Sequence, residues 1–172
     1  MKLAFNSVLS KFNESPLWGL HLMVPIDIAK KLITKKDRRV ICHINDEFTF
    51  HCALMPDGEG GFFIMLNKEF KKKSRLDIGE PLKVKLEKDT SEYGMPMPEE
   101  LGELLVMDEL GSKYFHALTP GKQRSLIHLV AKNKRIETRI NKALVIVDYL
   151  KNAKGDLDYK ELNQAFKNHN SI

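Results

Sequence analysis

Four side chains of the types that bind metal ions lie close together in the first half of the chain: Cys42, His43, His51 and Cys52. The pair Asn45-Asp46 between them tolerates positive φ angles and predicts a β-hairpin with a two-residue turn. In that register Cys42 faces Thr49 and shares a face with His51, whereas His43 and Cys52 share the other face. Tetrahedral zinc needs ligands that converge on one point. We therefore expect no metal site here, and interpret the cysteines as core residues and the histidines as rim residues.

Other motifs do not predict catalysis. The glycines of Gly58–Gly61 precede a predicted strand, so no helix N-terminus is available to hold a phosphate. Glu99, Glu100 and Glu103 fall in the first turn of a predicted helix, where carboxylates stabilise the helix dipole. No serine or cysteine stands in a nucleophile motif, although a catalytic triad is a spatial arrangement that sequence alone does not reveal. We predict no catalytic residues and no cofactor.

A cluster of cationic side chains in two consecutive predicted helices indicates binding. Residues 119–154 hold nine basic and two acidic residues, a net charge of +7, whereas the whole chain carries +5. The basic residues form stripes beside the apolar faces of these helices, and such a surface attracts anions, including the phosphates of nucleic acids. The candidate anion-binding residues are Arg124, Lys132, Arg135, Arg139 and Lys142.

An ordinary solvated helix face is the alternative interpretation of the same residues. Arg139 lies at the boundary of the apolar face, where its stem would cover the core and its guanidinium would pair with a carboxylate. The sequence leaves both interpretations open.

A cavity in the strand-rich half is a second candidate site. It would hold a small molecule or a peptide beside Trp18 or Phe50. A single tryptophan on a strand is, however, more often a core residue than a platform for a ligand.

The elements that must position these residues change in type along the chain. Period-2 alternation and turn motifs predict strands in the first half, with a clear hairpin over residues 38–54 and short helices over residues 26–33 and 68–76. Helical spacing begins at Pro96, with Gly111 as a helix stop, Thr119-Pro120 as a helix start and Asn133 as the cap of the last long helix. Leu157, Leu162 and Phe166 indicate a short amphipathic helix in the tail.

Length and composition favour a cytoplasmic protein. The 172 residues, 42% of them hydrophobic, can bury one core or two small adjoining cores. No apolar stretch is long enough to span a membrane, so we expect no membrane insertion. Two cysteines without a CxxC pair favour a reducing compartment.

The order of these motifs resembles two known modules. RRVICHINDEFTFHCALMPDGEGGFFIML, IGEPLKVKLEKD and MPEEL are similar to a bacterial domain of unknown function that adopts a double-split β-barrel. LTPGKQRSLIHLVAKNKRIETRINKAL resembles the helical motif of the YdeI/OmpD-associated family, which is named for bacteriocin protection. The resemblance implies an α+β protein: a β-barrel domain over residues 1–95, a small C-terminal helical subdomain over residues 96–154, and a tail over residues 155–172. The usual Asn-Gly turn of the family is Asn45-Asp46 here.

These observations predict a bacterial binding protein without catalysis, linked by resemblance to bacteriocin protection or envelope stress. Its partner would be anionic, such as nucleic acid, and would bind the basic helical surface. Binding of a small molecule or peptide in the barrel cavity is the alternative, and an enzyme with a spatially assembled site ranks third. Oligomeric state does not follow from the sequence.

Overall fold

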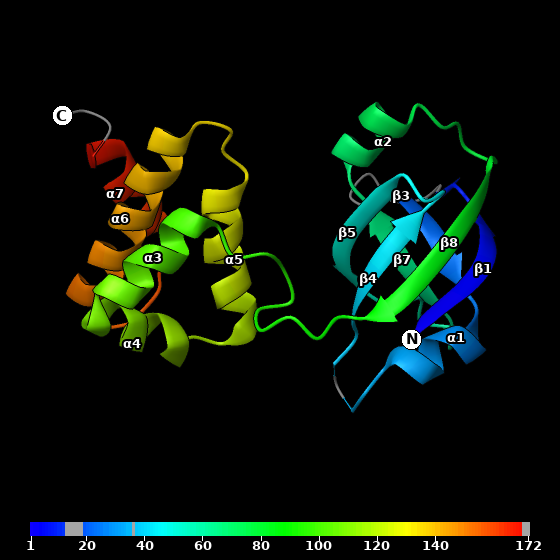
Figure 1. Ribbon diagram of the computed structural model, residues 1–172, viewed down its shortest axis with the longest axis horizontal. Helices are drawn as coiled ribbons and strands as arrows, with labels where there is room; N and C mark the ends of the chain where they lie inside the picture. Colours follow the sequence, from blue (N-terminus) through cyan, green and yellow to red (C-terminus); the bar gives the residue numbers. More distant parts are fainter. Residues whose placement is uncertain (13–18, 36, 170–172) are drawn as a thin grey trace. The chain divides into compact units, whose positions relative to one another are not determined.

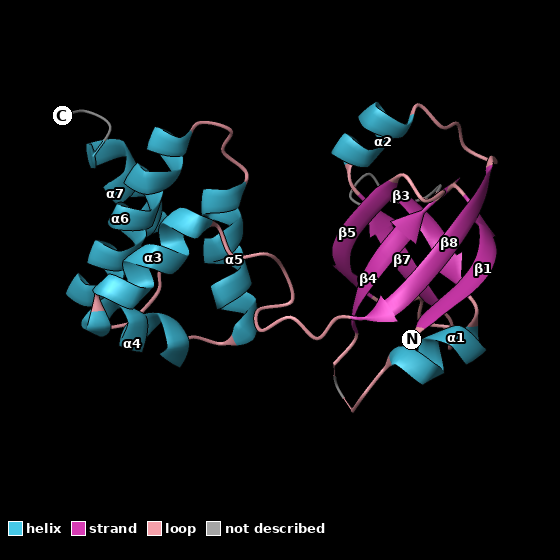
Figure 2. Cartoon of the chain, in the orientation of Figure 1, coloured by secondary structure: helices cyan, strands magenta, loops and turns pink. Residues whose placement is uncertain are grey.

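The computed structural model describes residues 1–12, 19–35 and 37–169. It divides into two compact units, Met1–Gly94 and Met95–Ile172 (Figure 1). The first unit contains the strands and two short helices, and the second contains only helices (Figure 2). The predicted α+β class is confirmed.

The strands of the first unit form two antiparallel four-stranded sheets. The first sheet has the order β1 (Lys2–Val8), β8 (Pro81–Lys88), β4 (Arg39–Ile44) and β5 (Phe48–Ala53). The second has the order β2 (Ser10–Lys11), β3 (Leu20–Val24), β7 (Phe62–Leu66) and β6 (Met55–Pro56).

Two stretches of chain pass from the first sheet into the second at a buried leucine. Leu9 separates β1 from β2, Leu54 separates β5 from β6, and both side chains are 0% exposed. Each leucine still bonds to the first sheet, because the N–H of Leu9 donates to the carbonyl of Glu80 and the N–H of Leu54 donates to that of Arg38. The two sheets therefore share these corners, but within the described residues they do not join into a closed barrel.

The core of the first unit lies between the two sheets. Period-2 alternation directs Leu82, Val84 and Leu86 of β8 inward, and the rings of Phe48 and Phe50 pack partly buried against the same cluster. Both faces therefore point into one β-core. The helices α1 (Ile26–Leu32) and α2 (Lys68–Ser74) lie at opposite ends of the strands (Figure 1).

The second unit packs its helices around α6. The helices are α3 (Glu99–Met107), α4 (Glu109–Ala117), α5 (Pro120–Ala131), α6 (Ile136–Asn152) and α7 (Tyr159–His169). α6 contacts each of the other four. Of the three apolar residues predicted to form a helix in the tail, Leu162 and Phe166 are the buried face of α7, whereas Leu157 is buried but precedes the helix.

Two predicted helix boundaries are wrong. Gly111 lies inside α4 rather than ending α3, because Asp108 ends α3 and caps α4 by accepting the N–H of Gly111. Asn133 does not cap α6, since its side-chain amide donates to the carbonyls of Leu129 and Val130 and so terminates α5. A polar residue between two helices can serve either neighbour, and sequence does not say which.

The apolar face of α6 is only partly buried. Ala143, Val147 and Leu150 are in the core, whereas Ile136, Ile140 and Leu144 are exposed. No helix among the described residues has the length and apolarity needed to cross a lipid bilayer.

Candidate functional site

A groove of about 500 Å³ runs along β5 in the first unit. One wall is β5 itself, with consecutive residues from 47 to 52 contributing, and the other wall is formed by Met65 of β7 and the residues of α2. Its floor is aromatic: the rings of Phe48 and Phe70 meet edge to face with centroids 5.2 Å apart, and Phe50 lies 6.3 Å from Phe70. Polar groups at the rim are Glu47, Thr49, His51, Asn67, Glu69 and Lys73.

Asn67 fixes the helical wall of this groove. Its side chain accepts the N–H of Phe70 at 2.7 Å and so forms the N-cap of α2. The cap starts the helix directly after β7, so that Phe70 points back over β5. Of the two predicted cavity residues, Phe50 lines the groove, and Trp18 lies outside the described residues.

The β4–β5 hairpin has a different register from the one predicted, shifted by one residue. Asn45 and Asp46 both have positive φ, as expected, but Glu47 is an additional loop residue and Ile44 pairs with Phe48. A shift of one residue exchanges the two faces of a strand. Cys42 therefore faces Phe50, and His43 faces Thr49.

The two cysteines consequently share the inner face and the two histidines the outer face. Contact with the Cys52 thiol, together with burial, raises the pKa of Cys42, so that it stays a neutral thiol. No group of three or more potential metal ligands occurs among the described residues.

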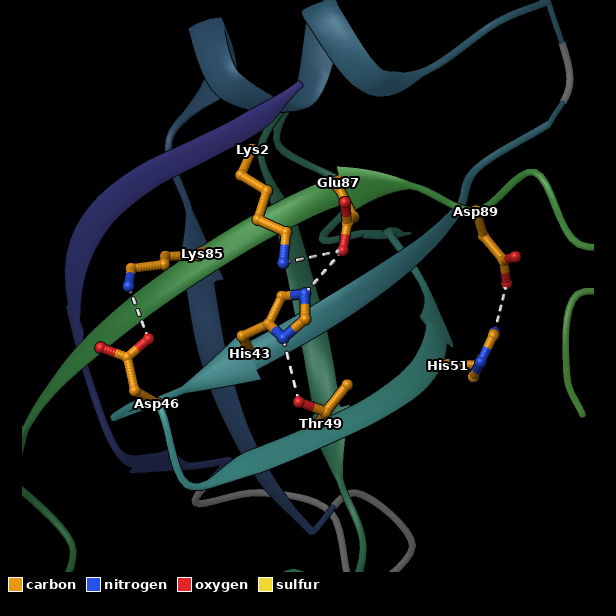
Figure 3. A network of polar contacts seen from close by, with 8 residues as sticks. All are labelled: Lys2, His43, Asp46, Thr49, His51, Lys85, Glu87 and Asp89. Atoms are coloured by element: carbon orange, nitrogen blue, oxygen red, sulfur yellow. Dashed lines mark hydrogen bonds and ion pairs between the residues drawn. The ribbon is translucent and has the colours of Figure 1, made fainter.

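A row of polar contacts crosses all four strands of the first sheet on its outer face (Figure 3). The Nδ1 atom of His43 lies 2.9 Å from the Thr49 hydroxyl, and its Nε2 atom lies 2.7 Å from a carboxylate oxygen of Glu87. The ammonium group of Lys2 is 3.4 Å from the same carboxylate. The hydrogen bond from His43, and to a lesser extent Lys2, holds the pKa of Glu87 below its usual value. We call this row Thr49–His43–Glu87–Lys2 the polar ladder.

A second histidine–carboxylate pair lies next to the ladder. Asp89 has a side chain that is 0% exposed and accepts from Nδ1 of His51 at 2.8 Å (Figure 3). Burial opposes ionisation of Asp89, but hydrogen bonds from Ser91 and His51 outweigh it and lower the pKa of the carboxyl group. The pair positions the His51 ring at the rim of the groove.

The polar ladder has the composition of a triad, since a hydroxyl, an imidazole and a carboxylate follow one another. In a working triad the hydroxyl attacks a substrate held beside oxyanion donors. The imidazole of His43 lies between the hydroxyl and the carboxylate as in a triad, but the contacts run from strand to strand along the sheet and end in an ion pair between Glu87 and Lys2. We interpret the ladder as cross-strand pairing that stabilises the sheet.

In the second unit, two of the predicted anion-binding residues are paired with carboxylates. Arg139 lies 2.7 Å from Glu100, and it also donates to the backbone carbonyls of Asn133 and Lys134. Its hydrogen bond holds the pKa of Glu100 below the usual value. Arg135, the residue before α6, lies 2.8 Å from Glu137, and both side chains are exposed.

The remaining predicted residues lie on α5 and α6 and at the end of α5. Lys132 follows α5 and is exposed, Arg124 lies within α5, and Lys142 lies within α6. The ammonium of Lys142 is 4.0 Å from the centre of the Phe166 ring. Burial, and secondarily the charge of Lys132, lowers the pKa of Lys142. Lys132 is thus the predicted cation whose charge acts on Lys142.

Two family models match the chain. A domain of unknown function (DUF1905) matches residues 5–86, the part that contains the groove. The model described as bacteriocin-protection, YdeI or OmpD-associated matches residues 94–153. The helical unit is thus similar to this bacteriocin-protection family, and the strand-containing unit is similar to the domain of unknown function. No curated protein matches it.

The match to the bacteriocin-protection family covers α3 to α6 and therefore all five predicted cations, whereas α7 lies beyond it. The domain of unknown function covers the groove but ends before Glu87 and Asp89. Sequence reasoning missed both histidine–carboxylate pairs, because their partners are separated by 44 and 38 residues. Alternating charged residues along β8 were the one available indication.

Proposed function

We propose that the chain is a non-catalytic binding protein that acts in bacteriocin protection by holding a small organic ligand or a peptide in the groove beside β5. The observation that carries this proposal is the groove itself. Its volume of about 500 Å³ falls within the range of roughly 300–1,000 Å³ that ligand sites occupy. An aromatic floor with polar groups at the rim is the usual composition of such sites.

The groove also fits the expected architecture. We propose that the first unit is the double-split β-barrel that the resemblance implies, with its splits beside the corners at Leu9 and Leu54. At the first corner the Ser7 hydroxyl donates to the carbonyl of Met23 at 2.9 Å and so links β1 to β3. At the second corner the groove lies between β5 and β7. A cytoplasmic location is part of the same proposal, on the ground of the cysteine usage.

A substitution that fills the groove tests this function. Lys73→Trp puts an indole at the rim on α2, whereas Lys72→Trp puts it on the same helix away from the groove lining. We expect Lys73→Trp to weaken binding of the apolar dye anilinonaphthalene sulfonate and to abolish protection of a bacteriocin-sensitive strain. Lys72→Trp should resemble the parent in both assays. Equal dye binding and equal survival for the two variants would remove the groove from the function.

Anion binding by α5 and α6 is a second candidate function. The net charge of +7 over residues 119–154 favours it. Because backbone phosphates would be the partners, binding should weaken steeply with salt and be largely blind to base sequence. Lys142→Ala should reduce both the affinity and the salt slope in an electrophoretic titration. If no nucleic acid binds even at low salt, the groove alone remains.

A further inference from the structure

The β5 wall of the groove consists of backbone as well as side chains. Residues 47 to 52 all line it, although alternate residues of a strand point to opposite faces. A groove lined by consecutive strand residues lies along the edge of that strand. β5 is the last strand of its sheet, so this edge has no neighbouring strand within the described residues.

The hydrogen-bond phase of the hairpin determines which backbone groups face the groove. In antiparallel pairs, residues that bond to the partner strand alternate with residues that point away from it. Leu54 donates to Arg38, the residue before β4, and by the same alternation Cys52, Phe50 and Phe48 bond to β4. The N–H and C=O groups of Thr49 and His51 consequently point out of the sheet, toward the groove.

The opposite wall offers a matching group. Asp57 donates to Gly61 in the β6–β7 hairpin, and the same alternation then directs Phe63 and Met65 toward the β6 side of β7. β6 pairs only with Phe62 and Phe63. Past the end of β6, the backbone of Met65 faces the groove. In the described part of the chain, β7 is not paired with β5.

We propose that the groove accepts an extended segment of a partner polypeptide, which adds as a strand to β5 and bonds to the backbones of Thr49 and His51. This inference rests on the proposed function and names the ligand class for the same site. Strand addition supplies affinity through the main chain, and alternate side chains supply specificity. Inward side chains of the segment would be apolar, since they meet Phe48, Phe50 and Phe70. Glu47 at the turn end would take a cationic residue.

The shape of the groove selects a single segment over the edge of a folded sheet. Met65, Phe70 and Lys73 close the side opposite β5. A second copy of this chain would bring a whole sheet to β5, and that sheet would collide with α2. An isolated extended peptide needs only the width of one strand.

The probe is a pool of short peptides with valine, leucine or phenylalanine at alternate positions and a lysine at one end. Two further pools carry N-methyl groups on one or the other set of alternate residues, which removes the N–H donors along one edge and keeps the side chains. We expect the parent pool to bind. Methylation along the edge that meets β5 should weaken binding roughly tenfold or more, because two or so hydrogen bonds of about 1 kcal/mol each are lost.

Amide hydrogen exchange of the full chain locates the contact. With the parent pool, the amides of Thr49, His51 and Met65 should gain protection, whereas that of Phe50, already bonded to β4, serves as the internal control. Lys73→Trp should prevent this protection and Lys72→Trp should not.

Three outcomes separate the inference from the function on which it rests. If the methylated pools all bind as tightly as the parent, or if Thr49 and His51 gain no protection, strand addition is overturned. If the dye binds the groove but the parent pool does not, strand addition is overturned and the groove function stands. If neither the dye nor the peptides bind, both are overturned.

Discussion

At the scale of single residues, Asp89 connects the groove rim to the core of the sheet. Its buried carboxylate accepts three hydrogen bonds: from Nδ1 of His51 at 2.8 Å, from the N–H of Ser91 at 3.0 Å and from the Ser91 hydroxyl at 2.6 Å. A buried carboxylate is stable only when its oxygens are satisfied in this way. One residue thus orients the imidazole at the rim and anchors the chain directly after β8.

Removing this carboxylate should be costly. We expect Asp89→Ala to lower the free energy of unfolding by about 1–3 kcal/mol, because it leaves the donors of His51 and Ser91 without their acceptor. Lys85→Ala is the control, since Lys85 lies within β8 and forms an exposed ion pair with Asp46 on the same face of the sheet. Urea denaturation measures both variants, and an equal effect of the two would contradict the assigned role of Asp89.

Alanine substitutions of Arg139 and Arg135 should differ in their effect on the melting temperature. The side chain of Arg139 is 25% exposed and contacts Glu100 and two backbone carbonyls, whereas that of Arg135 is 78% exposed and pairs with the equally exposed Glu137. Arg139→Ala should therefore lower the melting temperature and Arg135→Ala should leave it nearly unchanged. Arg139→Lys should fall between the parent and the alanine variant, because an ammonium cannot reproduce the planar fork of a guanidinium.

At the scale of elements, α4 and α6 approach each other closely at Gly111. A Cβ atom built there would lie 2.4 Å from Cγ1 of Val147, so that only glycine fits against α6. The glycine that the sequence presents as a helix stop is in fact a packing contact within α4.

Gly111→Ala should accordingly destabilise the second unit by about 1–3 kcal/mol through overpacking. Gly121→Ala, also within a helix, is the matched control, since nothing lies within 4 Å of its Cβ position. That control should be neutral or slightly stabilising, as alanine favours a helix over glycine by up to about 1 kcal/mol. Thermal unfolding monitored by circular dichroism distinguishes them, and a neutral Gly111→Ala would show that α4 and α6 can move apart freely.

The elements themselves were largely predictable, whereas their pairing was not. The strand predicted after Gly58–Gly61 and the short helix predicted from residue 68 depend on local patterns, and both are present as β7 and α2. The register of the hairpin depends on whether Glu47 joins the loop, and the turn motif alone does not decide that. Phe50 was a candidate cavity residue, but the groove needs α2 to fold back over β5, and no local pattern predicts that contact.

At the scale of the whole molecule, carboxylates with lowered pKa values occur in both units. They include Glu87 and Asp89 in the first unit and Glu100 and Asp108 in the second. Buried His21 adds an opposite kind of group: burial lowers its pKa, and its Nδ1 atom has no hydrogen-bond partner among the described residues. Near neutral pH the His21 imidazole is neutral and these carboxyl groups are ionised. These are the protonation states that the folded protein favours.

Stability should therefore fall in two stages as the pH decreases. His21 takes up a proton in the unfolded chain at its ordinary pKa of 6.5 but resists it in the folded state, so stability declines below about pH 6.5. The carboxylates add a steeper loss once the pH falls below about 4, where the unfolded chain binds more protons than the folded one. Urea denaturation across this range measures both stages, and His21→Phe should remove the first. A first stage that survives this substitution would assign it to another group.

The position of β8 between β1 and β4 has a consequence for synthesis of the chain on the ribosome. β1 is synthesised first, but it pairs with β8 at residues 81–88. β4 pairs with the same strand on its other side. Until β8 emerges, the nascent first unit presents two open strand edges, which are templates for aggregation. Completion of the central strand then closes both edges in one step. Emergence of residues 81–88 from the ribosome is thus the step at which the first sheet can close.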